Sequence, residues 1–146
     1  MRILLFGYGN PGCGDDALGP LLIEHIDQLR LINTKCLIEM QLLIEHTIDL
    51  LEFDQIVFID ADMSCAEPYQ FSTIHAEKDT SYTSHALTPS ALLFTYQQIY
   101  QRTAPSSFLL RIRGYQFELG EKPSNQAKMN LQAAILKIQH WHSQCT

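Results

Sequence analysis

The residues best suited to chemistry are two adjacent carboxylates, Asp15 and Asp16, at the end of a glycine-rich loop. A short apolar run enters this loop, whose glycines are Gly7, Gly9, Gly12 and Gly14. A glycine loop that opens a helix commonly binds phosphate through its free N–H groups, but two acids at this place repel a diphosphate. They are suited instead to capping the next helix and to offering oxygen ligands to a metal ion.

A third acid, Asp60, follows another apolar run, and His85 ends a polar stretch. Ligand sites in open α/β sheets lie beyond the carboxyl ends of the strands, where the strand order reverses. If the first and third strands are neighbours, as in a flavodoxin-like order, Asp16 and Asp60 converge on one cleft and His85 can complete it. Two carboxylates and an imidazole are compatible with nickel, zinc, manganese or iron.

Alternating strands and helices must position these residues. The hydrophobic pattern predicts a strand buried on both faces over residues 2–7, further strands over 35–43, 55–59 and 107–113, and an edge strand over 69–75. It predicts helices over residues 18–31, 44–52, 88–100 and 124–142, and a polar loop over 76–84. In the last helix, the predicted inward-facing residues are Ala127, Leu131, Ile135, Ile138 and Trp141.

This alternation implies right-handed βαβ units and one domain over residues 1–146. We expect an α/β fold, a three-layer α/β/α sandwich. Its centre is a mostly parallel, twisted sheet of about five strands with an antiparallel edge strand.

Composition excludes several classes of protein. The net charge of −6, the pI of about 5.4 and only 10 Lys and Arg residues argue against nucleic-acid binding. The sequence shows no signal peptide and no apolar run long enough to span a bilayer, so we expect a cytoplasmic protein without a membrane partner. The four cysteines form no Cys-x-x-Cys pair, which predicts reduced thiols.

Four segments carry a resemblance to a known family: Gly7-Tyr8-Gly9-Asn10, Gly14-Asp15-Asp16-Ala17-Leu18-Gly19-Pro20, Phe58-Ile59-Asp60-Ala61 and Ser84-His85. Together they resemble the hydrogenase maturation endopeptidases, which trim the C-terminus of the large subunit of nickel-iron hydrogenases. The similarity covers nearly the whole chain. Residues 7–20, 81–89 and 113–121 look most like the branch that matures bidirectional, NAD(P)-coupled hydrogenases.

The resemblance implies an aspartyl-type peptidase, a monomer, in which Asp16, Asp60 and His85 bind nickel and serve in catalysis. The nickel belongs to the partner, the hydrogenase large-subunit precursor, and marks a precursor whose metal centre is assembled. The enzyme then removes the C-terminal extension. Either the metal or a carboxylate polarises the scissile carbonyl or activates water. Residues 76–84 and 115–122 are the expected contacts with the precursor.

This chain departs from the better-studied branch of the family at two places. That branch often has glutamate where this chain has Asp16, so the shorter aspartate arm must sit closer to the metal. It also has a paired-glycine segment where this chain has residues 40–46. We expect Glu45 and His46 in that segment to form a solvated helix start rather than part of the cleft.

Several residues near the motifs have structural interpretations. Asp15 is expected to cap a helix and hold the loop rather than bind metal, and Asn10 to fix the loop through side-chain to backbone bonds. Cys13 is the one thiol near the predicted cleft, and we interpret it as a small hydrophobe rather than a nucleophile. Asp62 is a candidate to orient the metal ligands.

Two alternative functions stay open. Gly7-x-Gly9-x-x-Gly12 after a strand, with Glu39 able to contact a ribose, is also the pattern of a dinucleotide-binding Rossmann-like protein. Pro11 and the two following acids argue against it. A non-catalytic, nickel-dependent assembly chaperone predicts the same metal ligands as the peptidase, and only the length of the precursor after incubation separates the two.

Overall fold

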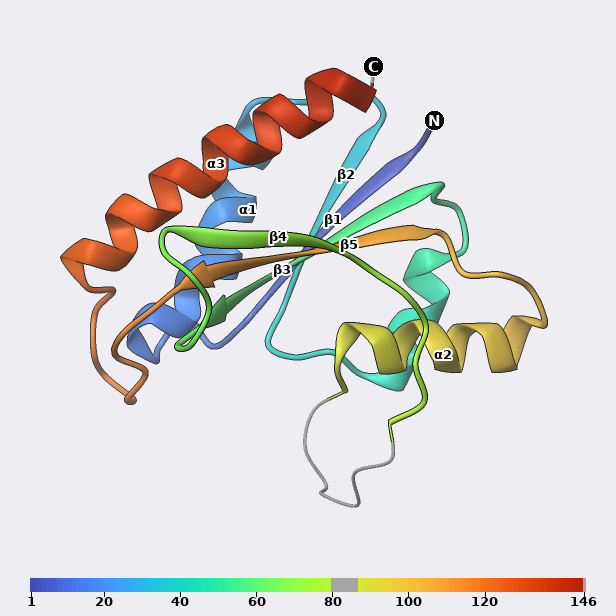
Figure 1. The fold of residues 1–146 in the computed structure, drawn as a ribbon, viewed down its shortest axis with the longest axis horizontal. Helices are drawn as coiled ribbons and strands as arrows, with labels where there is room; N and C mark the ends of the chain where they lie inside the picture. The colour runs from blue at the N-terminus through green and yellow to red at the C-terminus, as the bar shows by residue number, and fades with distance from the viewer. Residues whose placement is uncertain (80–86, 146) are drawn as a thin grey trace.

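A five-stranded sheet forms the centre of the protein, in a computed structural model that describes residues 1–79 and 87–145 (Figure 1). Its strands are β1 (Ile3–Tyr8), β2 (Thr34–Glu39), β3 (Gln55–Asp62), β4 (Tyr69–Ile74) and β5 (Ser106–Arg113). The strand order is β2-β1-β3-β5-β4, and every pair is parallel except β4 with β5. The predicted mostly parallel sheet with an antiparallel edge strand is confirmed.

Helices cover both faces of this sheet (Figure 1). They are α1 (Leu18–Gln28), α2 (Pro89–Tyr100) and α3 (Asn125–Cys145), with two 3-10 helices, η1 (Gly14–Ala17) and η2 (Ile44–Leu50). Helices α1 and α3 pack on one face, and α2 and η2 pack on the other. The predicted three layers are therefore present. None of the helices in the described residues has the length and apolarity needed to cross a membrane.

The apolar pattern of each element accounts for the two cores. Successive side chains of a strand point to opposite faces. Ile3 and Leu5 of β1 therefore join the core under α1 and α3, while Leu4 and Phe6 join the core under α2 and η2. All the residues of α3 that were predicted to face inward are buried. Thr88 caps α2 at the predicted start of this helix, because its Oγ1 accepts a hydrogen bond from Ala91 N at 3.1 Å.

Several element boundaries differ from the predictions, and three of them have a clear tertiary or backbone reason. Strand β2 ends at Glu39 rather than at residue 43, because its neighbour β1 ends at Tyr8, which pairs with Glu39. Helix α1 ends at Gln28, since Arg30 has a left-handed φ of 51°. Strand β3 extends to Asp62 because β5 continues beside it to Arg113. The predicted helix over 44–52 is the 3-10 helix η2.

Candidate functional site

The pairing of β1 with β3 brings Asp16 and Asp60 to the same edge of the sheet. In this parallel pair Gly7 lies opposite Ile59, so Tyr8 reaches the level of Asp60 at the carboxyl ends of the strands. The start of α1, next to Asp16, packs closely on these ends. A Cβ atom on Gly19 would lie 2.7 Å from the carbonyl oxygens of both Tyr8 and Ile59. The predicted neighbour relation of the first and third strands is confirmed.

The glycine loop holds the Asp16 carboxylate in place. Asn10 N donates to Asp16 Oδ2 at 2.7 Å, and Asp16 N donates to Cys13 O at 3.1 Å. Gly9 makes this path possible, with φ of +147° and only 2.0 Å between the position of an added Cβ and Asp16 O. Asp16 is half-buried, and no described residue donates a hydrogen bond to its Oδ1. This oxygen is therefore available to a cation.

Asp60 is half-buried on β3 and is coupled electrostatically to Asp16. Ala61 N donates to Asp60 Oδ1 at 2.8 Å. Burial raises the pKa of Asp60 to about 7; the Ala61 N–H opposes this shift, and the negative charge of Asp16 adds to it. The negative charge that raises the proton affinity of Asp60 in this poorly solvated place also attracts a metal cation. The arrangement suits a divalent ion bound through oxygen ligands.

Tyr8, the last residue of β1, orients Asp60. Its hydroxyl donates a hydrogen bond to the Asp60 carboxylate, and burial followed by the charge of Asp60 raises the pKa of Tyr8 above its usual range. Tyr8 therefore stays neutral and remains a donor. A role for Tyr8 in the site was not predicted from the sequence. The register of β1 with β3 identifies Tyr8, because it places this residue beside Asp60.

Asp62 shares the face of Asp60, two residues further along β3, but its partners lie elsewhere. Its Oδ1 accepts hydrogen bonds from Ser64 N at 2.7 Å and Ser64 Oγ at 2.8 Å, and its Oδ2 lies 3.2 Å from Arg111 Nη1. Burial acts to raise the pKa of Asp62, but the Ser64 bonds and the Arg111 charge together hold it below its usual value. Asp62 is thus tied to β5 and to the following turn.

Asp15 holds the loop, as predicted, but the prediction that it caps the following helix was wrong, because no side chain caps η1 or α1. It is fully buried and accepts four hydrogen bonds from Tyr115 N, Gln116 N, Ser124 N and Ser124 Oγ, at 2.7, 3.2, 2.6 and 2.8 Å. These donors belong to the segment before α3, not to the helix that follows Asp15. Residues 115–122 are also bound to the glycine loop, through Gly14 N to Glu121 O and Gly120 N to Gly12 O. Asp15 therefore fastens two loops together beside Asp16.

The third predicted ligand, His85, lies outside the described residues, as does most of the predicted contact loop 76–84. Within residues 1–79 and 87–145, no group of three His, Cys, Asp or Glu side chains lies close enough to hold a metal ion. The described structure therefore brings together two of the three predicted ligands, Asp16 and Asp60.

The glycine loop is not a phosphate cradle, because its amides are already used. From Gly9 to Asp16, every residue with an N–H donates to an acceptor within the protein; Pro11 has none. One acceptor is Asn10 Oδ1, 2.9 Å from Gly12 N, which confirms the predicted role of Asn10. A pyrophosphate would have to displace these bonds and approach Asp16. The geometry argues against the dinucleotide-binding alternative.

His46 is buried, so the prediction of a solvated position was wrong for this residue, although Glu45 is exposed. The 3-10 turn η2 directs the ring inward, where it packs edge-on against Phe6 with centroids 5.1 Å apart. Leu43 N donates to His46 Nδ1 at 2.9 Å, so Nε2 carries the proton of the neutral ring and faces Glu39 Oε1 at 3.6 Å. The Glu39 carboxylate, which the dinucleotide-binding alternative assigns to a ribose, therefore faces His46 instead.

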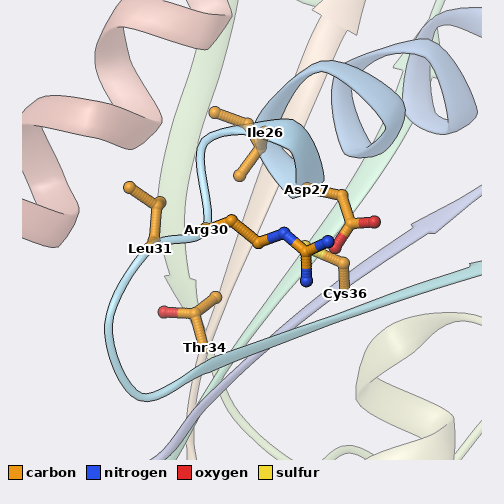
Figure 2. Close-up of a pocket in the computed structure, with 6 residues that line it drawn as sticks. All are labelled: Ile26, Asp27, Arg30, Leu31, Thr34 and Cys36. Atoms are coloured by element: carbon orange, nitrogen blue, oxygen red, sulfur yellow. The ribbon is translucent and has the colours of Figure 1, made fainter.

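A pocket of about 160 Å³ lies at the opposite end of the sheet, where β2 begins at Thr34 (Figure 2). Figure 2 shows Asp27, Arg30 and Cys36 gathered on one side of it. Burial, and to a lesser extent Asp27, raise the pKa of Cys36 to about 11, so this thiol stays protonated at neutral pH. The pocket is separate from the carboxyl edge that bears Asp16 and Asp60.

Solved structures of hydrogenase maturation proteins resemble this chain over most of its length. The [NiFe] hydrogenase maturation protease HycI from Thermococcus kodakarensis KOD1 superposes with a TM-score of 0.71 at 23% identity, over 94% of this chain and 89% of the other. The hydrogenase maturating endopeptidase HybD from E. coli gives 0.72 at 17% identity, over 94% and 90%. The endopeptidase HycI from Escherichia coli gives 0.72 at 19% identity, over 97% and 91%.

No protein-family model matches the chain, and no curated protein sequence matches it. At these identities, the likeness to solved structures concerns the arrangement of the backbone. The three superpositions cover 94–97% of this chain, whose core is the five-stranded mixed sheet with helices on both faces. The chain therefore has the α/β fold that is also seen in hydrogenase maturation endopeptidases.

Proposed function

We propose that this protein is an endopeptidase that removes the C-terminal extension of a nickel-iron hydrogenase large-subunit precursor after nickel insertion. The observation that carries the proposal is the convergence of Asp16 and Asp60 at the carboxyl edge of β1 and β3, in a fold shared with such endopeptidases. The sequence resemblance at residues 7–20, 58–61 and 84–85 supports the same conclusion.

In this proposal the nickel is part of the substrate. Asp16 offers Oδ1, which no described residue engages, and Asp60 is oriented by Tyr8 and Ala61. His85 is included on the sequence resemblance. These three residues would dock the nickel held by the precursor and so position the scissile peptide bond beside two carboxylates. A divalent ion or a carboxylate at this place can polarise the carbonyl or activate water for hydrolysis.

The proposal extends to the partner and the setting. The resemblance at residues 81–89 and 113–121 favours a bidirectional, NAD(P)-coupled hydrogenase as the source of the precursor. The four cysteines are free thiols, which favours action in the reducing cytoplasm. The enzyme is proposed to act as a monomer.

The test is to incubate the protein with nickel-loaded and nickel-free precursor and to follow the precursor mass. Wild type should shorten only the loaded form, and Asp16→Asn and Asp60→Asn should abolish shortening. Asp54→Asn is the matched control, because Asp54 is an exposed acid just before the opposite end of β3. Full activity in folded Asp60→Asn would contradict metal docking. Binding of loaded precursor without shortening would favour the non-catalytic assembly chaperone.

A further inference from the structure

A strip of polar side chains crosses the carboxyl end of the sheet on the face that carries α2 and η2. Side chains on this face follow the strand alternation, from Phe58 to Asp60 and Asp62 on β3, and from Leu109 to Arg111 and Arg113 on β5. In register, Asp60 lies beside Arg111 and Asp62 beside Arg113. The acids of β3 therefore alternate with the arginines of β5 on one face of the sheet, and Asp62 Oδ2 lies 3.2 Å from Arg111 Nη1.

Only one of the two arginines has a carboxylate partner among the described residues. Arg111 pairs with Asp62, which leaves no acid for Arg113 within ion-pair distance among the described residues. Arg113 Nη1 instead donates to Cys65 O at 2.9 Å, and its guanidinium lies 5.2 Å from the centroid of the Tyr115 ring. Both arginines are only partly exposed, and in both the buried Nε lacks a described hydrogen-bond partner.

A partly desolvated guanidinium remains charged and gains from an anion that accepts two of its N–H groups. We propose that Arg111 and Arg113 bind a carboxylate of the polypeptide substrate, beside the metal-docking pair Asp16 and Asp60. This inference rests on the proposed function. The strip then has an acidic end for a cation and a basic end for an anion, and so fixes the direction in which the substrate crosses the sheet.

The carboxylate can come from two sources. One is an Asp or Glu side chain of the precursor near the scissile bond. The other is the new C-terminal carboxylate that hydrolysis creates on the mature large subunit. The first source is present before cleavage and lowers KM, whereas the second is present only afterwards and strengthens product inhibition.

The experiment compares wild type with Arg111→Gln and Arg113→Gln in the processing of nickel-loaded precursor. Hydrogen bonds to charged groups contribute about 1.5–3 kcal/mol, so each change should weaken binding of the carboxylate by about 10- to 100-fold. Because an ionic contact has been lost, a salt dependence should become shallower in both variants: that of kcat/KM if a side chain is bound, and that of the product inhibition constant if the new C-terminus is bound. A purely structural role for the arginines would not change this salt dependence.

Arg102→Gln is the matched control. Arg102 also stacks on a tyrosine, 5.6 Å from the Tyr96 ring centroid, and its Nη2 also donates to a backbone carbonyl, Leu51 O at 3.0 Å. Its removal takes away a similar set of packing contacts far from Asp60. Arg102→Gln should keep the wild-type KM and salt dependence.

Two further experiments identify the source of the bound carboxylate. Precursors whose acids near the cut are changed to Asn or Gln should show the raised KM of Arg113→Gln if a side chain is bound. If the new C-terminus is bound, processed large subunit should inhibit wild type at least tenfold more strongly than Arg113→Gln.

Wild-type KM, salt dependence and product inhibition together in folded Arg113→Gln would overturn this inference and leave the proposed function standing. Failure of wild type to shorten any precursor would overturn both. Arg111→Gln leaves Asp62 without its ion-pair partner, so if it does not fold, Arg113→Gln and the salt dependence of wild type decide the matter.

Discussion

Replacing Asp15 by alanine should destabilise this protein more than any change at the neighbouring Asp16. The side chain of Asp15 is fully buried and accepts four hydrogen bonds from the segment that leads into α3. Alanine leaves three backbone N–H groups, those of Tyr115, Gln116 and Ser124, without their acceptor.

The magnitude follows from these contacts. A hydrogen bond to a charged acceptor contributes about 1.5–3 kcal/mol, but the Gln116 bond is long at 3.2 Å and water can reach part of the space that is left. The four bonds also share one carboxylate and are not additive. We expect a loss of about 3–5 kcal/mol, a large fraction of the about 5–15 kcal/mol typical of a domain. Asp15→Asn, which keeps one acceptor oxygen, should cost less.

Urea unfolding measures this loss, and the single tryptophan, Trp141, is a suitable probe because it is buried in α3. With a slope of about 1–3 kcal/mol per molar urea, the midpoint should fall by at least about 1 M. Asp16→Asn is the control and should change stability by less than about 1 kcal/mol, because one backbone N–H is its only described hydrogen-bond donor. A folded Asp15→Ala protein within about 1 kcal/mol of wild type would refute the assignment of Asp15 as the fastening between the two loops.

Three further predictions concern the glycine loop and the thiols. Gly9→Ala should lower the free energy of unfolding in urea by about 3 kcal/mol, since the added Cβ would lie 2.0 Å from Asp16 O. Gly120→Ala is the control: its φ is +87° and the space around it is open, so it should lower this free energy by only about 1 kcal/mol. Cys13→Ser should process precursor within about twofold of wild type, and loss of activity in this folded variant would assign catalysis to the thiol. Because the pKa of Cys36 is raised to about 11, its alkylation by iodoacetamide, followed by peptide mass, should accelerate about tenfold per pH unit up to that value; a rate that levels off below pH 9 would contradict it.

The elements and their order could be predicted from local patterns. The apolar run of β1 and the 3.6-residue periodicity of α3 identify a buried strand and an amphipathic helix without any knowledge of their neighbours. Thr88 and Pro89 likewise announce the start of α2, because capping depends on contacts within one turn. The general rule for parallel sheets then predicts that Asp16 and Asp60 meet.

The features that were predicted wrongly depend on partners that are distant in the sequence. Residues 40–43 are apolar enough for a strand, but β2 has no partner beyond Glu39 because β1 ends there. Asp60 and Asp62 lie inside β3 only because β5 continues beside them. The inward position of His46 depends on its contact with Phe6, which no local pattern announces.

The sequence by itself determined the strands and helices, the glycine loop and the presence of acids at two strand ends, because these depend on contacts between near neighbours. Only the tertiary structure decided which partners the adjacent Asp15 and Asp16 contact. Asp15 and Asp16 lie on the 3-10 helix η1, where successive side chains diverge by about 120°. One carboxylate therefore enters the interior and fastens residues 115–124, while the other faces the sheet edge beside Asp60. The environment of each side chain, which comes from residues far along the chain, sets its chemistry.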